Sequence, residues 1–327
     1  MMPGSHPRHE EGAALLSVLL LVAIIAVLAA ASLEKLKLAT HLAGNGIAID
    51  QARAYALSAE TVTLFRVGDL LQRDASKTTL QGNWANNDVN FPIDGGVASA
   101  RLSDSGNCFN LNSLVGTPTN TGYVVRPEAV TQFEHLMELL DIPSADARRV
   151  SVAAADWIDS DSAPLPGGAE DESYSAAAVP YRTANALMAD PSELRAVAGV
   201  TPALYTRVRP FLCALPVADL SPVNINTLLV DQAPLLAMLV PGLDIARARS
   251  LIGARPAEGF SDLTAFWERP GLMGTPDSAK QQVRLKTRWF ELHLLVEMSG
   301  AELEENALID AALQPAKLVR RSYGAAT

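Results

Sequence analysis

The feature of this chain that most restricts its fold is an apolar run close to the N-terminus. Residues 13–31 read AALLSVLLLVAIIAVLAAA, in which Ser17 is the single polar side chain. A helix rises about 1.5 Å per residue, so this run is about as long as a hydrocarbon core about 30 Å thick. The sequence therefore predicts one membrane-spanning helix over residues 13–33.

The residues that flank the run allow two kinds of processing. A secretory signal would be cut on its C-terminal side, where residues 29–32 (AAAS) are small. The alternative cut lies in front of the run, between Gly12 and Ala13, after a short charged leader. Helix-forming residues continue without a proline over residues 33–71, and a cleaved signal would not need such a continuation. The sequence therefore favours the cut after Gly12.

The continuing helix carries a stripe of apolar, mostly small side chains at steps of three and four, which must pack on another surface. This small-residue stripe consists of Ala48, Ala52, Tyr55, Ala59 and Val62. Gly44-Asn45-Gly46 precedes it, and each glycine inside a helix costs about 1 kcal/mol relative to alanine. We therefore expect local melting or a kink at these glycines.

Charge and cysteine content limit the partners and the compartment. A net charge of −10 makes nucleic acid a poor partner. The chain has two cysteines, Cys108 and Cys213, which a cytosolic protein would keep reduced and a periplasmic protein more often pairs. We predict a disulfide between them, worth about 4–5 kcal/mol in the chain-entropy model. Two unrelated buried thiols are the alternative.

A small antiparallel sheet is predicted from two distant parts of the chain. Residues 97–102 alternate in polarity, and residues 288–298 and 306–314 flank a polar turn. About 180 residues are inserted between these parts. The fold class is therefore α+β, with a long N-terminal helix, a small sheet and a large inserted α-helical domain.

The insert contains a weak internal repeat. Residues 109–114 (FNLNSL) are echoed by residues 223–228 (VNINTL), and residues 137–150 by residues 238–251. Two related helical units therefore follow one another. The shared Asn-x-Asn-Ser/Thr pattern suits the start of a helix, where these side chains satisfy free backbone amides.

The second unit also raises a rival function. Residues 224–260 resemble helix-hairpin-helix modules, which bind the DNA backbone through the amides of a Gly-hydrophobic-Gly hairpin. Here the hairpin is Gly242-Leu243-Asp244, so an aspartate adds negative charge and a Cβ where a phosphate would approach. We interpret the unit as a helical interaction module, and a membrane-anchored DNA-uptake receptor is the alternative function.

The segment richest in chemistry is residues 156–174, DWIDSDSAPLPGGAEDESY. Carboxylates on both sides of its Pro-Gly turn can converge, and such clustering requires a cation. Oxygen ligands favour calcium, but Ala163 stands where an EF-hand loop has its third ligand. A solvated acidic loop is the alternative. A glycosidase-like carboxylate pair is conceivable, but nothing in the sequence indicates a sugar-binding cleft. No Ser/His/Asp or Cys/His motif suggests an enzyme.

These segments occur together in one known order. The chain is similar, over nearly its whole length, to GspK-class minor pseudopilins of the type II secretion system. The segments that carry the resemblance are the Gly12 junction and residues 55–60, 109–112, 156–161, 168–171 and 223–227.

The resemblance implies a pilin-like fold whose inserted domain consists of two SAM-like or helix-hairpin-helix-like units and binds calcium. The implied calcium ligands are Asp159, Asp161, Glu170, Asp171 and, with less support, Asp156. The implied segments are a leader (1–12), a transmembrane helix (13–33), its periplasmic continuation with the first strands (34–108), the first helical unit (109–217), the second (218–280) and the C-terminal strands (281–327).

The resemblance also implies a function that is structural and not enzymatic. Such a protein helps initiate and cap the pseudopilus that exports folded proteins, and it is held in the inner membrane with its C-terminal domain in the periplasm. Its expected partners are the prepilin peptidase and other minor and major pseudopilins, bound through the small-residue stripe, with no nucleic acid and no small-molecule substrate. Ser17 would be residue 5 of the mature chain, where most pseudopilins carry glutamate, and a neutral residue suits a tip subunit with nothing above it.

Overall fold

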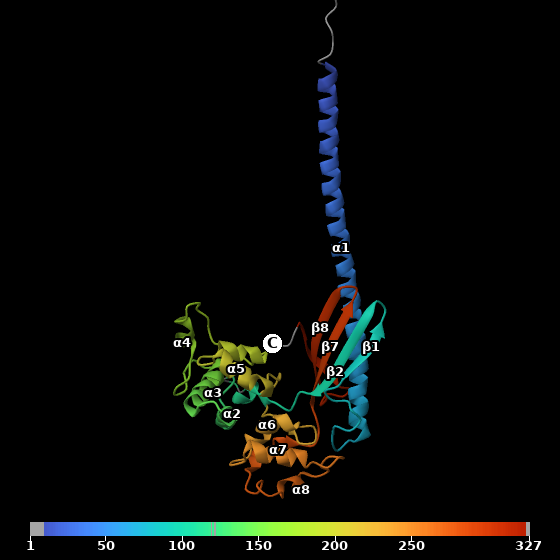
Figure 1. The fold of residues 1–327 in the computed structure, drawn as a ribbon. Helices are drawn as coiled ribbons and strands as arrows, with labels where there is room; N and C mark the ends of the chain where they lie inside the picture. The colour runs from blue at the N-terminus through green and yellow to red at the C-terminus, as the bar shows by residue number, and fades with distance from the viewer. Residues whose placement is uncertain (1–9, 119, 121, 325–327) are drawn as a thin grey trace, which may run out of the picture.

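A single long helix dominates the computed structural model, which describes residues 10–118, 120 and 122–324 (Figure 1). Helix α1 (Glu10–Arg73) has 64 residues. Residues 12–47 are exposed on all sides, and the following turns pack against a sheet. Among the described residues, α1 is the one helix long and apolar enough to cross a membrane.

Helix α1 continues without a break through the glycines at 44 and 46, so the predicted melting or kink is wrong for this conformation. No side chain or backbone atom from elsewhere comes within 4 Å of either glycine's Cβ position, so nothing pushes the helix apart there. Helix propagation is cooperative, and the long flanking segments outweigh a local cost of about 1 kcal/mol per glycine.

Five antiparallel strands form the sheet that covers the C-terminal part of α1 (Figure 1). Their order is β1-β2-β7-β8-β9, and the central pair β2 and β7 joins residues almost 200 positions apart, such as Ser99 and Leu295. The strands are β1 (Asp88–Ile93), β2 (Gly96–Asp104), β7 (Trp289–Met298), β8 (Ala301–Asp310) and β9 (Lys317–Tyr323). Strand β8 begins earlier than the predicted residue 306, because residues 301–305 (AELEE) already pair with residues 294–298 of β7 in spite of their three glutamates.

The long insert leaves the sheet after β2 and returns at β7, and it contains two helical units. The first unit consists of β3 (Phe109–Asn110), η1 (Leu111–Leu114), α2 (Pro127–Leu139), α3 (Ser144–Ile158), α4 (Asp171–Ser175), η2 (Pro191–Ala196), α5 (Pro202–Val208), η3 (Arg209–Phe211) and β4 (Leu212–Cys213). The second consists of β5 (Val223–Asn224), η4 (Val230–Gln232), α6 (Ala233–Ala237), α7 (Ile245–Gly253), α8 (Leu263–Trp267), α9 (Asp277–Lys280) and β6 (Val283–Arg284). One continuous hydrophobic core runs through both units.

The two units are closed in the same way. Strand β3 pairs in parallel with β4, and β5 pairs in parallel with β6, so each unit begins and ends at a short two-stranded neck. Asn110 and Asn224 start the two repeats, and each accepts a hydrogen bond from the amide two residues on. Each asparagine also reaches a distant segment: Asn110 accepts from the amide of Leu215, and Asn224 donates to the carbonyl of Thr78. The predicted capping role is confirmed for Asn110, which caps η1, whereas Asn224 is followed by a turn over residues 225–227 and caps no helix. Both side chains also cross-link distant segments.

Cys108 and Cys213 form the predicted disulfide at the neck of the first unit, with their Cα atoms 5.7 Å apart. The bridge packs with Trp289 and Leu308, so it lies where the insert meets the sheet. The prediction of a bridged pair is confirmed, and the bridge joins the two ends of the first unit where they pack against the sheet.

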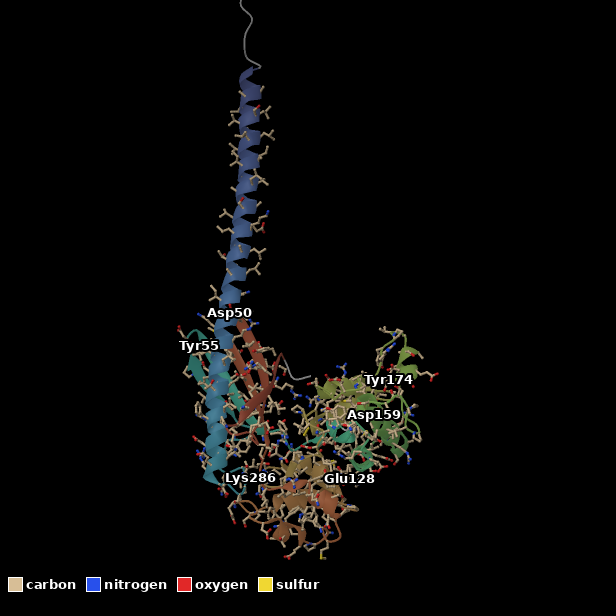
Figure 2. The ribbon with its side chains drawn as sticks, turned by 180° about the vertical axis from the view of Figure 1, so that it is seen from behind. Asp50, Tyr55, Glu128, Asp159, Tyr174 and Lys286 are labelled. Atoms are coloured by element: carbon tan, nitrogen blue, oxygen red, sulfur yellow. A yellow bond between two sulfur atoms is a disulfide. The ribbon has the colours of Figure 1, made fainter. Side chains whose placement is uncertain are left out.

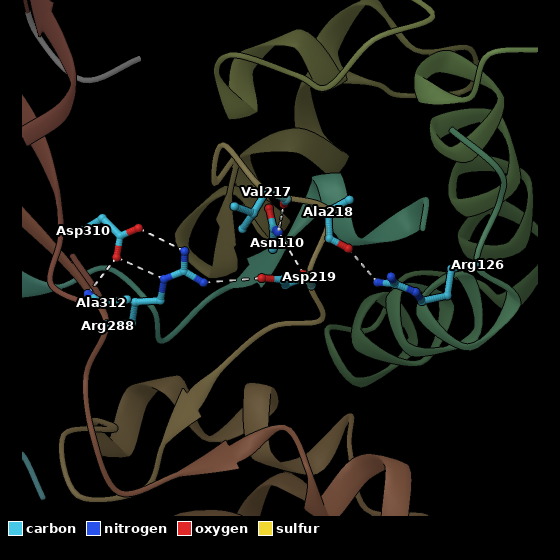
Figure 3. A network of polar contacts seen from close by, with 8 residues as sticks. All are labelled: Asn110, Arg126, Val217, Ala218, Asp219, Arg288, Asp310 and Ala312. Atoms are coloured by element: carbon cyan, nitrogen blue, oxygen red, sulfur yellow. Dashed lines mark hydrogen bonds and ion pairs between the residues drawn. The ribbon is translucent and has the colours of Figure 1, made fainter. Parts of the chain in front are cut away.

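Side chains from three other segments contact the connector between β4 and β5 (Figure 3). Arg288, just before β7, pairs with Asp310 of β8 at 2.9 Å and with Asp219 of the connector at 3.4 Å. Asn110 donates to two connector carbonyls, and Arg126 donates to a third. These contacts fix both helical units relative to the sheet.

Candidate metal centre

Three carboxylates converge in a loop of the first unit. Asp159 follows the last residue of α3, Asp161 lies two residues further, and Glu170 directly precedes α4. Ligand atoms of these three side chains lie within 4.8 Å of one another, and we call this group the acidic triad. Figure 2 shows Asp159 close to Tyr174 in the insert, well away from α1.

The loop takes this shape because Asp156 holds its returning half. Asp156 lies in the last turn of α3 and is fully buried. Its carboxylate accepts hydrogen bonds from the amides of Leu165, at 3.2 Å, and Ala169, at 2.9 Å. A Cβ at Gly168 would lie 1.9 Å from the Asp156 carboxylate, so a glycine is required there.

The triad is electrostatically unfavourable without a cation. Asp159 is 2% exposed and Glu170 is 5% exposed. Burial, followed by the neighbouring carboxylates of Asp161, Asp156 and Glu170, raises the pKa of Asp159 to about 7. Burial, followed by Asp156, also raises the pKa of Glu170. In the described part of the chain, no lysine or arginine forms an ion pair with any member of the triad.

The donor set fits a hard divalent cation. One oxygen of Asp159 and one of Glu170 are buried without a hydrogen-bond partner. Such oxygens carry the full cost of desolvation unless something binds them. The triad offers oxygen ligands alone, which suits calcium or magnesium better than zinc. The triad could therefore hold a metal ion.

The structure gives the other two predicted ligands different contacts. Asp156 binds backbone amides, as described above. Asp171 accepts hydrogen bonds from the amide and the hydroxyl of Thr183, at 2.9 and 2.8 Å, and these bonds lower its pKa. The Thr183 hydroxyl also lies 3.4 Å from Glu170. The sequence did not reveal Thr183, because it lies in an irregular segment with no periodicity.

Three aromatic rings pack beside the acidic triad. Trp157 lies edge-on to Tyr174, with ring centroids 5.2 Å apart, and Tyr181 completes the group. Trp157 precedes Asp159 by two residues, and Tyr174 follows Glu170 by four. The indole of Trp157 is therefore close enough in the chain for its fluorescence to respond to an ion bound in the loop.

The small-residue stripe of α1 packs mainly inside this chain. Ala48 and Ala52 are buried, and Tyr55 and Ala59 pack against the hydrophobic core between α1 and the sheet. Figure 2 shows Tyr55 on α1 beside the sheet. Val62 alone among the five is largely open, at 53% exposed. Small side chains suit close packing on a sheet as well as on another helix, so periodicity alone could not separate the two.

The remaining predicted residues lie near the start of α1. Residues 1–9 of the leader lie outside the described residues, and Gly12 and Ala13 lie in the first turns of the helix. The Ser17 hydroxyl donates to the carbonyl of Ala13 at 2.9 Å. Ser17 is thus satisfied within its own helix.

The hairpin of the second unit is closed by its own aspartate. Gly242 has a φ of +74°, which suits a tight turn. The side chain of Asp244 accepts a hydrogen bond from the amide of Arg247 at 2.7 Å and caps α7. A phosphate at this helix start would meet a carboxylate, so the geometry gives no support to DNA binding.

The fold and the acidic loop define a class of protein: an α+β protein with one long apolar helix, a five-stranded sheet and an inserted helical region that can hold a metal ion. Family models described as "Type II secretion system (T2SS), protein K" match residues 107–217 and 223–288. The chain is 36% identical to type II secretion system protein K of Pectobacterium carotovorum subsp. carotovorum, over 97% of each chain. It is also 36% identical to the protein K of Klebsiella pneumoniae, again over 97% of each.

A solved structure agrees with these relatives. A chain in the crystal structure of the GspK-GspI-GspJ complex from enterotoxigenic Escherichia coli matches with a TM-score of 0.73 and 32% identity, covering 84% of this chain and 96% of that one. The protein therefore belongs to the type II secretion system protein K (GspK) family. This is a family of secretion-system structural proteins and not of enzymes.

Proposed function

We propose that this protein is a minor pseudopilin at the tip of the type II secretion pseudopilus, where it helps start assembly and caps the filament for export of folded proteins. The observation that carries the proposal is the position of the insert. It projects to one side of the sheet and past the end of α1 opposite the apolar half (Figure 1). Repeating that bulk along a filament would obstruct lateral packing, whereas one copy at an end would not.

The number and place of copies test this proposal. Immunogold labelling should find the protein at one end of each pseudopilus, and excess protein should give more numerous, shorter filaments. Label distributed along the filament would refute the tip position.

We propose that residues 13–33 of α1 span the inner membrane and that the prepilin peptidase cuts between Gly12 and Ala13. A glutamate at position 17 would cost several kcal/mol in hydrocarbon unless a neighbouring subunit supplied a partner. Ser17 needs no such neighbour, since it bonds within its own helix. Mass spectrometry should find a mature terminus at Ala13, and Gly12→Val should leave the precursor uncut. A terminus near Ser32 would contradict the proposal.

We propose that counterparts of GspI and GspJ, the partners named for the E. coli relative, bind the outward face of α1. This face differs from most of the small-residue stripe. It presents Leu57, Val62 and Phe65, which are 51%, 53% and 73% exposed. Phe65→Ser should reduce copurification with these partners. Val319→Ser, at an exposed position of β9, is the matched control and should leave it unchanged.

We propose that the acidic triad binds calcium. The support is the pair of buried, unpartnered oxygens and the absence of nitrogen or sulfur ligands from the triad. Terbium, a common probe for calcium sites, should emit when Trp157 is excited, and calcium should displace it. Asp159→Asn should abolish the emission. Asp171→Asn should preserve it, because Asp171 is engaged by Thr183.

We propose that the sheet and α1 form a pilin-like module and that the insert comprises two SAM-like units, over residues 109–217 and 218–280. The repeated two-stranded necks support the division into two units, and the second neck favours an end of the second unit at β6, a few residues beyond 280. The asparagine that starts each unit supports it as well. Limited proteolysis should cut first between or outside these units.

A further inference from the structure

Three charged side chains meet beneath α1, at a place that the proposed function does not use. Glu60 of α1, Glu305 of β8 and Arg321 of β9 form this group, which we call the junction cluster. Nε and Nη2 of Arg321 each donate to one oxygen of Glu60 at 2.5 Å. Nε of Arg321 also lies 3.6 Å from Glu305. Glu60 and Glu305 are both buried, and Glu305 is only 1% exposed.

The junction cluster has two carboxylates for one cation. Both oxygens of Glu305 are buried with no hydrogen-bond donor bound to them. Of the elements packed around it, α1 contributes Glu60, β9 contributes Arg321 and the phenol of Tyr323, and β7 places the apolar Leu294 opposite. Glu304 and His293 lie on the other face of the sheet, because alternate residues of a strand point to opposite faces. No second cation in the described residues pairs with either glutamate.

We propose that Glu60 and Glu305 share one proton, and that this proton makes the seating of α1 on the sheet sensitive to pH. With the proton, Glu305 donates a hydrogen bond to Glu60, and the pair carries one negative charge that Arg321 balances. Without it, two buried carboxylates repel each other and one is left without a donor.

The titration of the two glutamates supports this arrangement. Burial, followed by contact with Glu60, raises the pKa of Glu305 from 4.5 to about 8. Burial would also raise the pKa of Glu60, but hydrogen bonds with Arg321 and Glu305 outweigh it and hold that pKa below its ordinary value. Between 4.5 and about 8 the folded protein therefore binds more protons than the unfolded chain. Stability falls as pH rises through this window, and the loss is complete above it.

Loss of the shared proton affects only the junction of α1 with the sheet. Helix α1 connects the apolar N-terminal segment to the sheet, and the junction cluster lies where it crosses β8 and β9. Loss of the proton weakens this crossing. The insert has its own core and its disulfide, so it stays folded.

Hydrogen exchange on the full-length protein in detergent tests the proposal. Three forms are compared at about pH 6 and about pH 9, with rates corrected for the intrinsic pH dependence of amide exchange: wild type, Glu305→Gln, and the neighbouring Glu304→Gln as matched control. In wild type and Glu304→Gln, protection of residues 52–67 should fall about tenfold or more at the higher pH. In Glu305→Gln it should change by less than about twofold, because glutamine donates to Glu60 at both pH values.

Infrared spectroscopy adds a direct readout of the proton. One component of the carboxylic-acid carbonyl band should disappear between about pH 6 and about pH 9 in wild type and Glu304→Gln, and this component should be missing from Glu305→Gln. The component from Asp159, whose pKa is about 7, should be present in all three forms. If Glu305→Gln does not fold, Glu60→Gln replaces it, because one carboxylate then faces one guanidinium and the first component should again be missing. The same pH dependence in Glu305→Gln as in wild type, or no such component in wild type, would overturn the proposal.

Discussion

Two groups of buried carboxylates in this protein balance their charge in different ways. In the junction cluster, Glu60 and Glu305 face Arg321, a cation supplied by the same chain. In the acidic triad, the two buried members, Asp159 and Glu170, have no ion pair with any described lysine or arginine. The first group is complete with one proton. The second could hold a cation from solution, and this difference contrasts a folding element with a candidate binding site.

The largest effect should follow from removing the internal cation. Arg321→Met leaves the one negative charge that Glu60 and Glu305 share buried without a cation, and breaking a buried pair costs about 3–5 kcal/mol. We expect about 3 kcal/mol, because a third of Arg321 is exposed to solvent. Denaturant unfolding at neutral pH measures this loss.

An exposed pair provides the control for that variant. Arg101→Met breaks the pair between Arg101 and Asp88, in which both side chains are nearly half exposed. Exposed pairs contribute about 0–1 kcal/mol, so this variant should unfold almost as wild type does. Equal losses in the two variants would show that the junction cluster is no more important than a surface pair.

Removing the external cation should have the next largest effect. A ligand at a hundred times its dissociation constant stabilises the folded state by about 2.7 kcal/mol. Chelation of calcium should therefore lower the melting temperature by about 5–10 °C, and Asp159→Asn should melt at the low temperature with or without chelator. If the chelator does not change the melting temperature of the wild type, the acidic triad does not depend on an external cation and the contrast between the two groups is wrong.

The pH dependence of calcium binding should be smaller and opposite in sign to that of the junction. The cation binds the ionised carboxylates, and the pKa of Asp159 is about 7. Each pH unit below that value should weaken calcium binding about tenfold, if one proton competes. Acid therefore weakens the metal centre while it strengthens the junction cluster. Calorimetric titration at two pH values measures this, and an affinity that does not change with pH would contradict it.

The smallest effect should come from replacing Asp171, the acidic residue next to Glu170 that is not a member of the triad. Asp171→Asn loses charge but keeps an acceptor for Thr183, so we expect less than about 1 kcal/mol and an almost unchanged calcium affinity. Asp161→Asn is the comparison, since Asp161 supplies a triad oxygen. If both variants lose affinity equally, the ligand set is wider than the triad.

Local patterns predicted the features that depend on nearby residues. The apolar run together with the helix-forming residues 33–71 predicted most of α1, and clustered aspartates predicted an acidic loop. The Asn-x-Asn repeat predicted two capped helix starts, of which the one at Asn110 is present. The pairing of Cys108 with Cys213 followed from there being only two cysteines and from the expected compartment. These inferences need no knowledge of which distant segments meet.

The features that the sequence did not reveal depend on such meetings. Glu60 pairs with Arg321, 261 residues away, and no periodic pattern connects them. Asp171 is held by Thr183 and so differs from Glu170, its neighbour in sequence. The small-residue stripe has the right spacing for a partner helix, but the sheet of its own chain covers most of it.

The disulfide at the neck of the first unit has a mechanical consequence. A pull applied between the apolar half of α1 and the C-terminal strands passes from Cys108 directly to Cys213, so the 105-residue separation between them bears almost no load. The second unit contains no cysteine, and its neck is held by the short pairing of β5 with β6. Once the pairing of β2 with β7 is broken, tension along the chain would therefore open the second unit, while the loop that carries the acidic triad bears no tension.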